Sequence, residues 1–450
     1  MPIFASNPES AVSESIEKLD SKEMQWLCLS YHFEQYYLSE PKPLELIAII
    51  EIDRSGVRYI SVGEHRLDAV EQCANIESHE SMRAAANKLE WPVINCREAI
   101  KLEPISIAKP WGQEIWYTGI EARGQSKITD GRFSTPIPWL LSAAPTELAG
   151  ALHQRLNLLK ILDPLPEPVF GDLYFELHEE KQEVYVVTNV SPAAWPDQRG
   201  KIRIGFDQSL RAEFESDELF VEAFTRAVKQ YESIRRKIDE QLDVCRRRDR
   251  VGLNHPVPAA QTKRWLATVD EQLLDEEKDL RAQLDSFKGS LDLCVGDVLK
   301  VPCFTPHSLM HGVRTIEFQT PVYERKILAF AQKVLTQNQW DTDAAVDCMK
   351  LDDHHLQPLA QISKTRTELV EEVVDFSDFT VLRITLAPNT QFELPLNYDY
   401  ALAIGVKGGT NIANCDLAPE QAVLLPRSIT GCEVTNSSDQ ESVLLVSLPK

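Results

Sequence analysis

The chain has 450 residues, more than one ordinary hydrophobic core accommodates, so two or three domains are expected. Its contents of 43% hydrophobic and 26% charged residues are those of a globular protein. The formal net charge of −22 argues against nucleic acid and anionic lipid as partners, because both require a basic surface. A local cluster of Lys and Arg is still able to bind a small phosphorylated molecule.

The terminal segment and the cysteines predict the cellular compartment. Residues 1–20 are polar and acidic and lack a charged segment followed by an apolar run, so no signal peptide is predicted. No apolar run reaches the length of about 18 residues that suggests a membrane span. Nine dispersed cysteines without an export signal are typical of reduced thiols. A cytoplasmic protein without membrane contact is expected.

Residues 1–105 have the pattern of a small α+β unit. Segment 43–62 predicts two strands around a turn at Ser55 and Gly56, and segment 67–89 predicts a helix. No chemistry is visible here. The expected role is a packing layer, with docking or dimerisation as the alternative.

A strand-rich region begins near residue 105 and extends to about Val190. Two helices follow. The first begins after Ser216, a good N-cap, with acidic residues in its first turn and an apolar face that recurs at helical spacing as far as Ile238. The second is predicted over about 261–288, with Gly289 as its C-cap.

The remaining third of the chain is predicted to be mostly strand. Segment 291–321 returns to strand, and "ERKILAFAQKVL" at 324–335 predicts another helix. Residues 340–359 are expected to form a loop, so the "DDHH" at 352–355 is interpreted as part of a linker. A final all-β stretch is predicted over about 370–448.

Segment 171–187, "GDLYFELHEEKQEVYVV", combines a strand pattern with metal-binding side chains. Residues two apart on a strand point to the same face, so Glu176 and His178 project together. After a turn at 179–182, Glu183 is expected to return on the pairing strand. Two carboxylates and an imidazole are suitable ligands for a divalent ion such as Zn, Mn or Fe.

A fourth ligand is expected from segment 296–311, "GDVLKVPCFTPHSLMH". His307 follows Pro306 at the predicted start of a strand, a good position for a side chain that points into a barrel, and His311 lies nearby. Glu179 and Glu180 are interpreted as solvated turn residues.

The two segments resemble the two sequence motifs of the cupin family. The spacing G-x4-E-x-H-x4-E over 171–183 is similar to the first motif, and G-x5-P-x3-P-H-x3-H over 296–311 is similar to the second. Ordinary cupins separate the motifs by a few tens of residues, whereas here a long stretch with two helices intervenes. That architecture resembles the type I mannose-6-phosphate isomerases.

Further segments support the resemblance over about residues 105–450. "KPWGQEIWYTG" resembles the aromatic-glycine segment that precedes the barrel in the family, and "EEKQEVYVV" resembles the segment that carries the second metal carboxylate. "VPCFTPHSL" resembles the segment that carries the last His ligand, and "IEFQTPVYERK" resembles the segment that follows that ligand. The resemblance implies as metal ligands Glu176, His178, Glu183 and His307. It implies that Lys181 binds a substrate oxygen or transfers a proton and that Arg325 contacts the enediolate or the phosphate. The implied substrate-binding residues are Trp111, Glu114 and Gln319.

Three departures from the family pattern affect this interpretation. Glu176 stands where the family has Gln, so two Glu and two His make a divalent site formally neutral, which weakens its Lewis acidity and favours Mn or Fe over Zn. Phe304 replaces the usual Gly of the second motif. The alignment of Arg325 with the family's active-site arginine requires a gap.

The predicted fold is mainly β: two cupin (double-stranded β-helix) barrels, an α-helical insertion and an N-terminal α+β extension. The predicted domains are the extension, residues 1–105; the metal-binding barrel, 106–350, with its insertion at about 216–288; and a degenerate second barrel, 351–450. Because no His follows His355, the second barrel has no such ligand set and is expected to be structural.

The predicted activity is metal-dependent aldose–ketose isomerisation of a hexose 6-phosphate, of the mannose 6-phosphate/fructose 6-phosphate type. The expected cofactor is one divalent metal, zinc first, with Mn or Fe as alternatives, and the expected partner is a small sugar phosphate. Two other functions remain open: a cupin metalloenzyme of another class, such as an Fe-dependent oxygenase, and a non-catalytic sugar-binding cupin.

Overall fold

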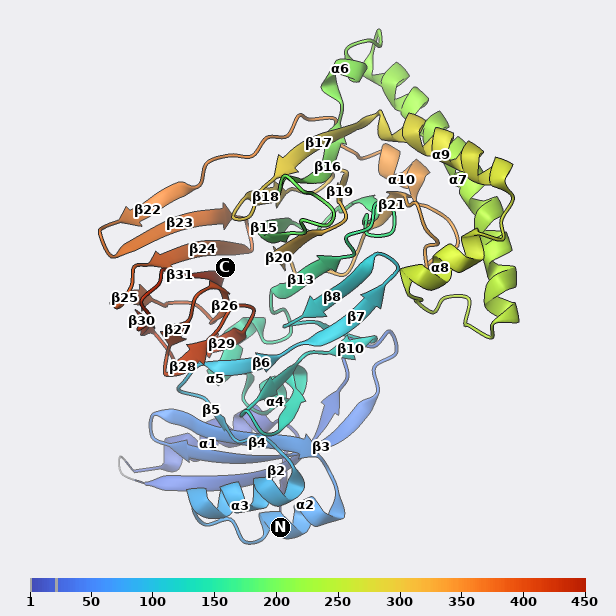
Figure 1. Ribbon diagram of the computed structural model, residues 1–450. Coiled ribbons are helices and arrows are strands. Elements are labelled where there is room, and N and C mark those ends of the chain that lie inside the picture. The colour runs from blue at the N-terminus through green and yellow to red at the C-terminus, as the bar shows by residue number, and fades with distance from the viewer. Residues whose placement is uncertain (1, 21–22) are drawn as a thin grey trace. The chain divides into compact units, whose positions relative to one another are not determined.

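Figure 1 shows the computed structural model, which describes residues 2–20 and 23–450. The chain is mainly β and forms two compact units. Unit 1 consists of residues 1–105, 116–159 and 359–450, and unit 2 of residues 106–115 and 160–358. In the described part of the chain, no helix is both long and apolar enough to cross a membrane.

The N-terminal part of unit 1 is a five-stranded sheet in the order β1-β2-β3-β4-β5, with three helices. The strands are β1 (Ile3–Phe4), β2 (Met24–Glu34), β3 (Pro43–Asp53), β4 (Gly56–Glu64) and β5 (Ile94–Asn95), and the helices are α1 (Pro8–Lys18), α2 (Leu67–Cys73) and α3 (His79–Leu89). The single helix predicted over 67–89 is wrong: it is two helices, because Ser78 forms a capping box with Ser81 and starts α3 anew.

The rest of unit 1 contains two further main sheets whose side chains pack into one core, with Val370, Leu394 and Ile412 among its members. The nine-stranded sheet consists of β12 (Ser134–Pro136), β11 (Lys127–Thr129), β6 (Ile100–Glu103), β29 (Ala422–Pro426), β26 (Tyr400–Lys407), β31 (Ser442–Pro449), β24 (Phe379–Leu386), β23 (Glu368–Asp375) and β22 (Ala360–Lys364). The four-stranded sheet consists of β25 (Thr390–Pro395), β30 (Gly431–Asn436), β27 (Thr410–Ile412) and β28 (Cys415–Leu417). Smaller elements are β9 (Ile120–Glu121), β10 (Gly124–Gln125), α4 (Ile137–Ala143), α5 (Pro145–Ala149) and the 3-10 helix η1 (Gly150–Leu152).

Two further sheets form most of unit 2. The six-stranded sheet consists, in order, of β18 (Val298–Val301), β15 (Glu183–Val190), β20 (Val313–Gln319), β13 (Leu158–Pro164), β8 (Gly112–Trp116) and β7 (Ile105–Lys109). The five-stranded sheet consists of β17 (Lys288–Leu293), β16 (Gly200–Phe206), β19 (His307–Leu309), β14 (Phe175–Leu177) and β21 (Lys326–Ala329). The two motif segments therefore contribute strands to both sheets.

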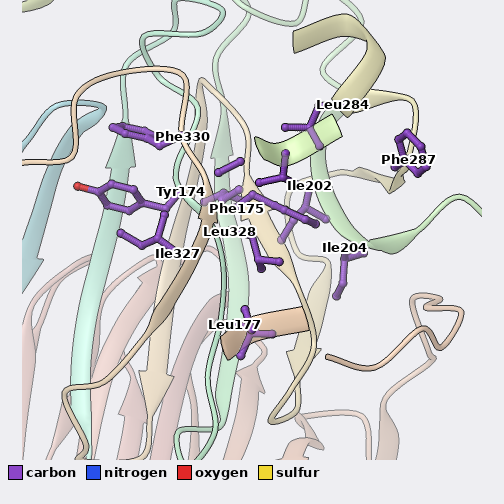
Figure 2. Packing of buried hydrophobic residues seen from close by; sticks show 14 of the residues in the cluster. Tyr174, Phe175, Leu177, Ile202, Ile204, Leu284, Phe287, Ile327, Leu328 and Phe330 are labelled. Atoms are coloured by element: carbon purple, nitrogen blue, oxygen red, sulfur yellow. The ribbon is translucent and has the colours of Figure 1, made fainter. Parts of the chain in front are cut away.

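The hydrophobic core of unit 2 is built from alternate residues of these strands (Figure 2). Phe175 and Leu177 flank Glu176 on β14 and are buried, as period-2 alternation requires. They belong to the same cluster as Ile202 of β16 and Ile327 of β21. This packing holds β14 in place and leaves the Glu176 side chain on the other face of the strand.

A helical segment is inserted between β16 and β17, which pair directly, with Ile202 opposite Leu291. It contains α6 (Gln208–Arg211), α7 (Asp217–Arg248), α8 (Ala259–Leu266) and α9 (Glu271–Asp285). The predicted start of α7 is confirmed: the Ser216 side chain accepts a hydrogen bond from the Leu219 amide. The apolar face of α7 is buried from Phe220 to Leu242.

The prediction of one helix over 261–288 is wrong. Helix α8 ends at Leu266, and Asp270 caps a new helix, α9, by accepting a hydrogen bond from the Gln272 amide. Gly289 is not a C-cap but lies within β17, where a Cβ atom would come within 2.4 Å of the Ile204 carbonyl oxygen. The glycine therefore permits close approach of two strands rather than the end of a helix.

The helix predicted over 324–335 is also wrong, because residues 326–329 form β21. The strand pairs with β14, with Phe175 opposite Ala329, and buries Ile327 and Leu328 together. A short apolar run fits a buried strand as well as a helix, and here the tertiary pairing decides. The short helix α10 (Thr342–Val346) lies in the segment predicted as a loop, and residues 352–355 belong to no helix or strand.

Candidate metal centre

Strand pairing in the five-stranded sheet brings Glu176 and His307 together. They are direct partners in the antiparallel register of β14 and β19, and β19 begins at His307 as predicted. His178 follows the last residue of β14. One ligand atom from each of Glu176, His178 and His307 lies within 4.8 Å of the other two, an arrangement that could hold a metal ion.

Glu183 reaches the same place from the other sheet. It is the first residue of β15, and its Oε1 and Oε2 atoms lie 3.4 Å from Nε2 of His178 and 3.2 Å from Nε2 of His307. The expectation that Glu183 lies on a strand paired with that of Glu176 is wrong, because β14 and β15 are in different sheets. The loop 178–182 crosses between the sheets, and all four predicted ligands still converge.

The hydrogen bonds of the two imidazoles fix their tautomers. Nδ1 of His178 donates to the Glu324 carbonyl oxygen at 2.9 Å, and Nδ1 of His307 donates to the Thr305 carbonyl oxygen at 3.0 Å. A carbonyl only accepts, so each Nδ1 carries a proton. In the neutral ring each Nε2 then has a free lone pair, and both face Glu183.

Two buried atoms of this arrangement lack the partner that a metal ion would supply. In the described part of the chain, Nε2 of His178 and Oε2 of Glu176 are buried and have no hydrogen-bond partner. Buried polar atoms are nearly always satisfied, so each such atom requires an explanation. Two imidazole nitrogens and two carboxylates form a donor set that suits Zn, Mn or Fe. The residues present therefore fit a divalent ion.

The protonation states also suit metal binding. Burial lowers the pKa of His178, and the neighbouring Lys181 ammonium lowers it further. Burial alone would raise the pKa of Glu183, but the neighbouring Lys181 ammonium opposes this, and the pKa is held well below the ordinary value. A neutral imidazole and an ionised carboxylate, the forms that bind metals, are thus the stable forms at neutral pH.

Glu183 is held in place by two further side chains. Nζ of Lys181 lies 2.6 Å from its Oε1 atom, and the hydroxyl of Tyr185 donates to its Oε2 atom at 2.6 Å. Lys181 is 7% exposed, so this ammonium is not the solvated turn lysine that a loop position suggests. Sequence reasoning missed Tyr185, although its position two residues after Glu183 on a strand places both on one face.

Arg325 and Gln319 lie next to this group. Nε of Arg325 lies 3.8 Å from Oε2 of Glu176, and its guanidinium carbon lies 4.5 Å from the ring centre of Tyr174. Gln319 is opposite Glu183 in the register of β15 and β20. Its buried Oε1 has no hydrogen-bond partner in residues 2–20 and 23–450.

The other predicted substrate-binding residues are buried. Trp111 is 1% exposed and belongs to the hydrophobic core of unit 2. Glu114 is ion-paired with Lys109 at 2.8 Å and with Lys160 at 3.6 Å, and Lys160 continues to Glu317 at 3.2 Å. Lys160 and Glu317 were not predicted; the signal was a lysine within the apolar run "LLKILDP".

Among the histidines of the second segment, His307 and not His311 joins the group. Nδ1 of His311 pairs with Asp172 at 2.7 Å, and its ring stacks on Trp195 at 4.7 Å between centroids. These contacts satisfy the imidazole without a metal.

A turn with unfavourable backbone geometry precedes His307. Phe304, which stands where cupins have Gly, has a φ of 68°, and its amide donates to the His178 carbonyl oxygen at 2.6 Å. A residue with a side chain is strained in this left-handed region. The turn nevertheless ties the His307 segment to His178.

We expect Phe304→Gly to be more stable than Phe304→Ala, the reverse of the order at ordinary positions. Both variants lose the ring, but only glycine relieves the left-handed strain of about 1–2 kcal/mol, part of which is offset by its unfolded-state entropy. A difference of about 1 kcal/mol corresponds to roughly 2 °C in melting temperature. Thermal unfolding of the two variants measures it, and an alanine variant of equal or higher melting temperature would contradict the prediction.

Comparisons with known proteins agree with this architecture. Neither a family model nor a curated protein matches the chain. Among solved structures, it is similar to mannose 6-phosphate isomerase from Bacillus subtilis, with a TM-score of 0.53 and 13% identity over 78% of this chain and 99% of that one. A zinc-bound mannose 6-phosphate isomerase gives a TM-score of 0.51 and 14% identity over 78% of this chain and 100% of that one. A variant of phosphomannose isomerase from Salmonella typhimurium gives a TM-score of 0.50 and 14% identity over 78% of this chain and 100% of that one.

These structures define the class of the fold. The chain has a cupin fold. More particularly, its fold is that of the type I phosphomannose isomerases, as the spacing of the two motifs and the long helical insertion predicted.

Proposed function

We propose that the chain is a metal-dependent aldose–ketose isomerase that acts on a hexose 6-phosphate, with fructose 6-phosphate as the ketose. One observation carries the proposal. The Nε2 atoms of His178 and His307 converge with the carboxylates of Glu176 and Glu183, and Lys181 contacts Glu183 at 2.6 Å. The fold shared with mannose 6-phosphate isomerases supports the choice of substrate class.

The proposed ligands are Glu176, His178, Glu183 and His307. When bound, a divalent ion would supply Lewis acidity at the substrate oxygens. Zinc is the proposed metal, with Mn or Fe as alternatives because Glu176 adds a second carboxylate to the site. The aldose and ketose differ by a proton moved from C2 to C1 through an enediolate, so the chain must provide a group that takes this proton and returns it.

Lys181 and Arg325 are the proposed catalytic residues. Lys181 is buried beside the ligand Glu183, so its ammonium is placed to handle a proton or to bind a substrate oxygen. Arg325 lies beside Glu176, and its guanidinium keeps its charge because the carboxylate outweighs the effect of burial and raises its pKa. A fixed cation suits an enediolate or a phosphate group. Gln319, Glu114 and Trp111 are proposed to line or support the substrate site.

The domain organisation is part of the proposal. We propose that residues 106–350 form the metal-binding barrel, with the helical insertion at about 216–288, and that residues 351–450 form a degenerate second barrel after the α+β extension 1–105. The pairing of β14 with β19 and of β15 with β18 and β20 supports a single barrel from both motif segments.

Elemental analysis of the untagged protein followed by a coupled assay tests the function. We expect about one equivalent of a divalent metal and reversible conversion of mannose 6-phosphate to fructose 6-phosphate that stops on chelation and returns with the metal. If protein loaded with Zn, Mn or Fe converts no aldose 6-phosphate, the isomerase proposal is wrong.

A second candidate is an Fe-dependent oxygenase, because Glu176, His178 and His307 alone form a two-histidine, one-carboxylate group. The proximity of Glu183 to both imidazoles favours a four-ligand site instead. Oxygen consumption by the iron-loaded protein, without isomerase activity, would select the oxygenase.

Glu176→Gln is expected to keep or raise isomerase turnover. The change restores the residue of the resembled family at nearly constant volume, and the amide oxygen still serves as a ligand while the site gains one positive charge. A role of Glu176 as the general base predicts instead a fall of roughly a hundredfold or more in turnover.

Turnover and metal content of metal-loaded Glu176→Gln are compared with those of Glu179→Gln. Glu179 is a half-exposed turn residue paired with Lys326 and controls for a nearby Glu-to-Gln change. A large fall in turnover with full metal content, seen only at Glu176, would contradict the ligand role.

A further inference from the structure

The helical insertion encloses a cavity that contains none of the proposed metal ligands. It has a volume of about 210 Å³ and lies within unit 2, between α7, α8, α9 and the segments 168–170 and 331–335. We refer to it as the insert cavity. It is formed by residues that the proposed isomerase chemistry does not use.

Four cationic side chains line the insert cavity: Arg235, Arg246, Arg281 and Lys333. Three of them are paired with carboxylates. Arg235 contacts Asp239 at 2.7 Å, Lys333 contacts Asp243 at 2.5 Å, and Arg281 contacts Glu277 at 3.3 Å. In a chain of net charge −22, a partly buried cluster with more cations than carboxylates is unusual.

Arg246 is the cation that lacks a carboxylate. It is 5% exposed, donates to the carbonyl oxygens of Gly252 and His255, and lies 5.3 Å from the ring centre of Trp265. In residues 2–20 and 23–450 no carboxylate lies within ion-pair distance of it. Asp243 and Asp239 act on its charge only from a longer distance, so an anion in direct contact with Arg246 would stabilise it.

A second buried donor points to the same conclusion. Arg235 is 5% exposed, and its Nε atom has no hydrogen-bond partner in the described residues. Its NH2 atom donates a hydrogen bond to Oδ1 of Asp239. Arg235 precedes Arg246 by eleven residues on α7, about 16 Å along the helix axis. A ligand group other than the one at Arg246 would therefore satisfy this donor.

The remaining lining is apolar and includes Phe170, Leu242, Trp265, Leu266 and Leu274. Small-molecule sites combine such a lining with a few placed polar groups. A sugar has too many hydroxyls for this surface, because each buried hydroxyl needs a partner.

We propose that the insert cavity is a binding site for a small carboxylic acid with an aromatic or branched aliphatic body. The carboxylate contacts Arg246, and the body packs on Trp265 and the leucines. One positive charge without a direct ion-pair partner matches a monoanion, whereas a phosphate monoester carries a charge of about −1.5 to −2.

Binding of three probes to the full-length protein tests the proposal: 3-phenylpropionate, its neutral analogue 3-phenylpropionamide, and 4-methylpentanoate. Calorimetric titration gives Kd and stoichiometry, and the fluorescence of Trp265, identified by its loss in Trp265→Phe, reports the place of binding. We expect one carboxylate per chain, bound at least about tenfold more tightly than the amide.

Two variants, each with a measured melting temperature, locate the site. Arg246→Gln removes the positive charge of the proposed carboxylate contact and is expected to weaken carboxylate binding at least about tenfold. Arg226→Gln is the matched control, because Arg226 is on the same helix but 68% exposed, and it should leave Kd unchanged. Leu274→Phe fills the cavity and should weaken the acid and the amide together, which keeps the test valid if Arg246→Gln does not fold.

Three results would overturn the proposal. They are equal affinity for the acid and the amide, unchanged affinity in the folded Leu274→Phe variant, and no saturable binding of either acid at about 10 mM. Because the readout is binding, none of these depends on whether the chain is an isomerase.

Discussion

His178→Ala is expected to lower the affinity for a divalent metal by roughly a hundredfold or more. Loss of a residue that only hydrogen-bonds to a metal ligand already lowers metal affinity about 10–100-fold, and His178 is itself a proposed ligand. The imidazole offers its free Nε2 to the site, and its replacement leaves Glu176 and Glu183 without one of the two neutral donors between them. Two carboxylates and one histidine hold the ion less well, so mild chelation should remove it.

Elemental analysis before and after chelation measures this change. His355→Ala is a suitable control, because this side chain is 72% exposed in the 352–355 segment and has a carboxylate partner, Asp353, of its own. We expect wild type and His355→Ala to keep the metal under conditions that strip His178→Ala. Stoichiometric metal in chelated His178→Ala would show that the site is assigned wrongly, and loss from His355→Ala would point to the 352–355 segment.

Strand periodicity accounts for how much of the site could be predicted. The spacing by two predicted that Glu176, on β14, and His178, which directly follows this strand, project together. The Pro306–His307 step predicted the start of β19. Both are local properties of the chain. The burial of Phe175 and Leu177 on either side of Glu176 follows from the same alternation.

Several errors arose where tertiary contacts decide the structure. Residues 324–335 carry an apolar run that fits a helix, but β14 provides an edge that pairs with residues 326–329. The place of Glu183 in a different sheet from Glu176 depends on how the barrel closes. The pair of Lys160 with Glu317 joins positions far apart in sequence, and no periodicity reports it.

The structure also changes the charge argument about Glu176. Counting ligands alone, two carboxylates make a divalent site neutral, but Lys181 lies 2.6 Å from Glu183 and contributes one positive charge to the same group. The buried ammonium offsets the carboxylate that replaces the family's Gln. A loaded site with Lys181 protonated therefore keeps a net positive field for a developing enediolate.

Lys181→Met is accordingly expected to lower isomerase turnover by roughly a hundredfold or more while the protein keeps its metal, because general acid–base groups typically contribute 10²–10⁴-fold. The ammonium is placed at Glu183 and is not itself a ligand, so the four donors remain. Without metal, the variant should lose stability, since a buried Glu183 would then lack its cation.

The experiment measures turnover, metal content and melting temperature with and without metal. Lys201→Met is the control, because Lys201 is a 45% exposed strand lysine, paired with Asp292, and should leave all three unchanged. We expect the metal to rescue the melting temperature of Lys181→Met but not its turnover. Near-normal turnover of the metal-loaded variant would assign Lys181 to holding Glu183 alone, and the proton would then have to be carried by another group at the site.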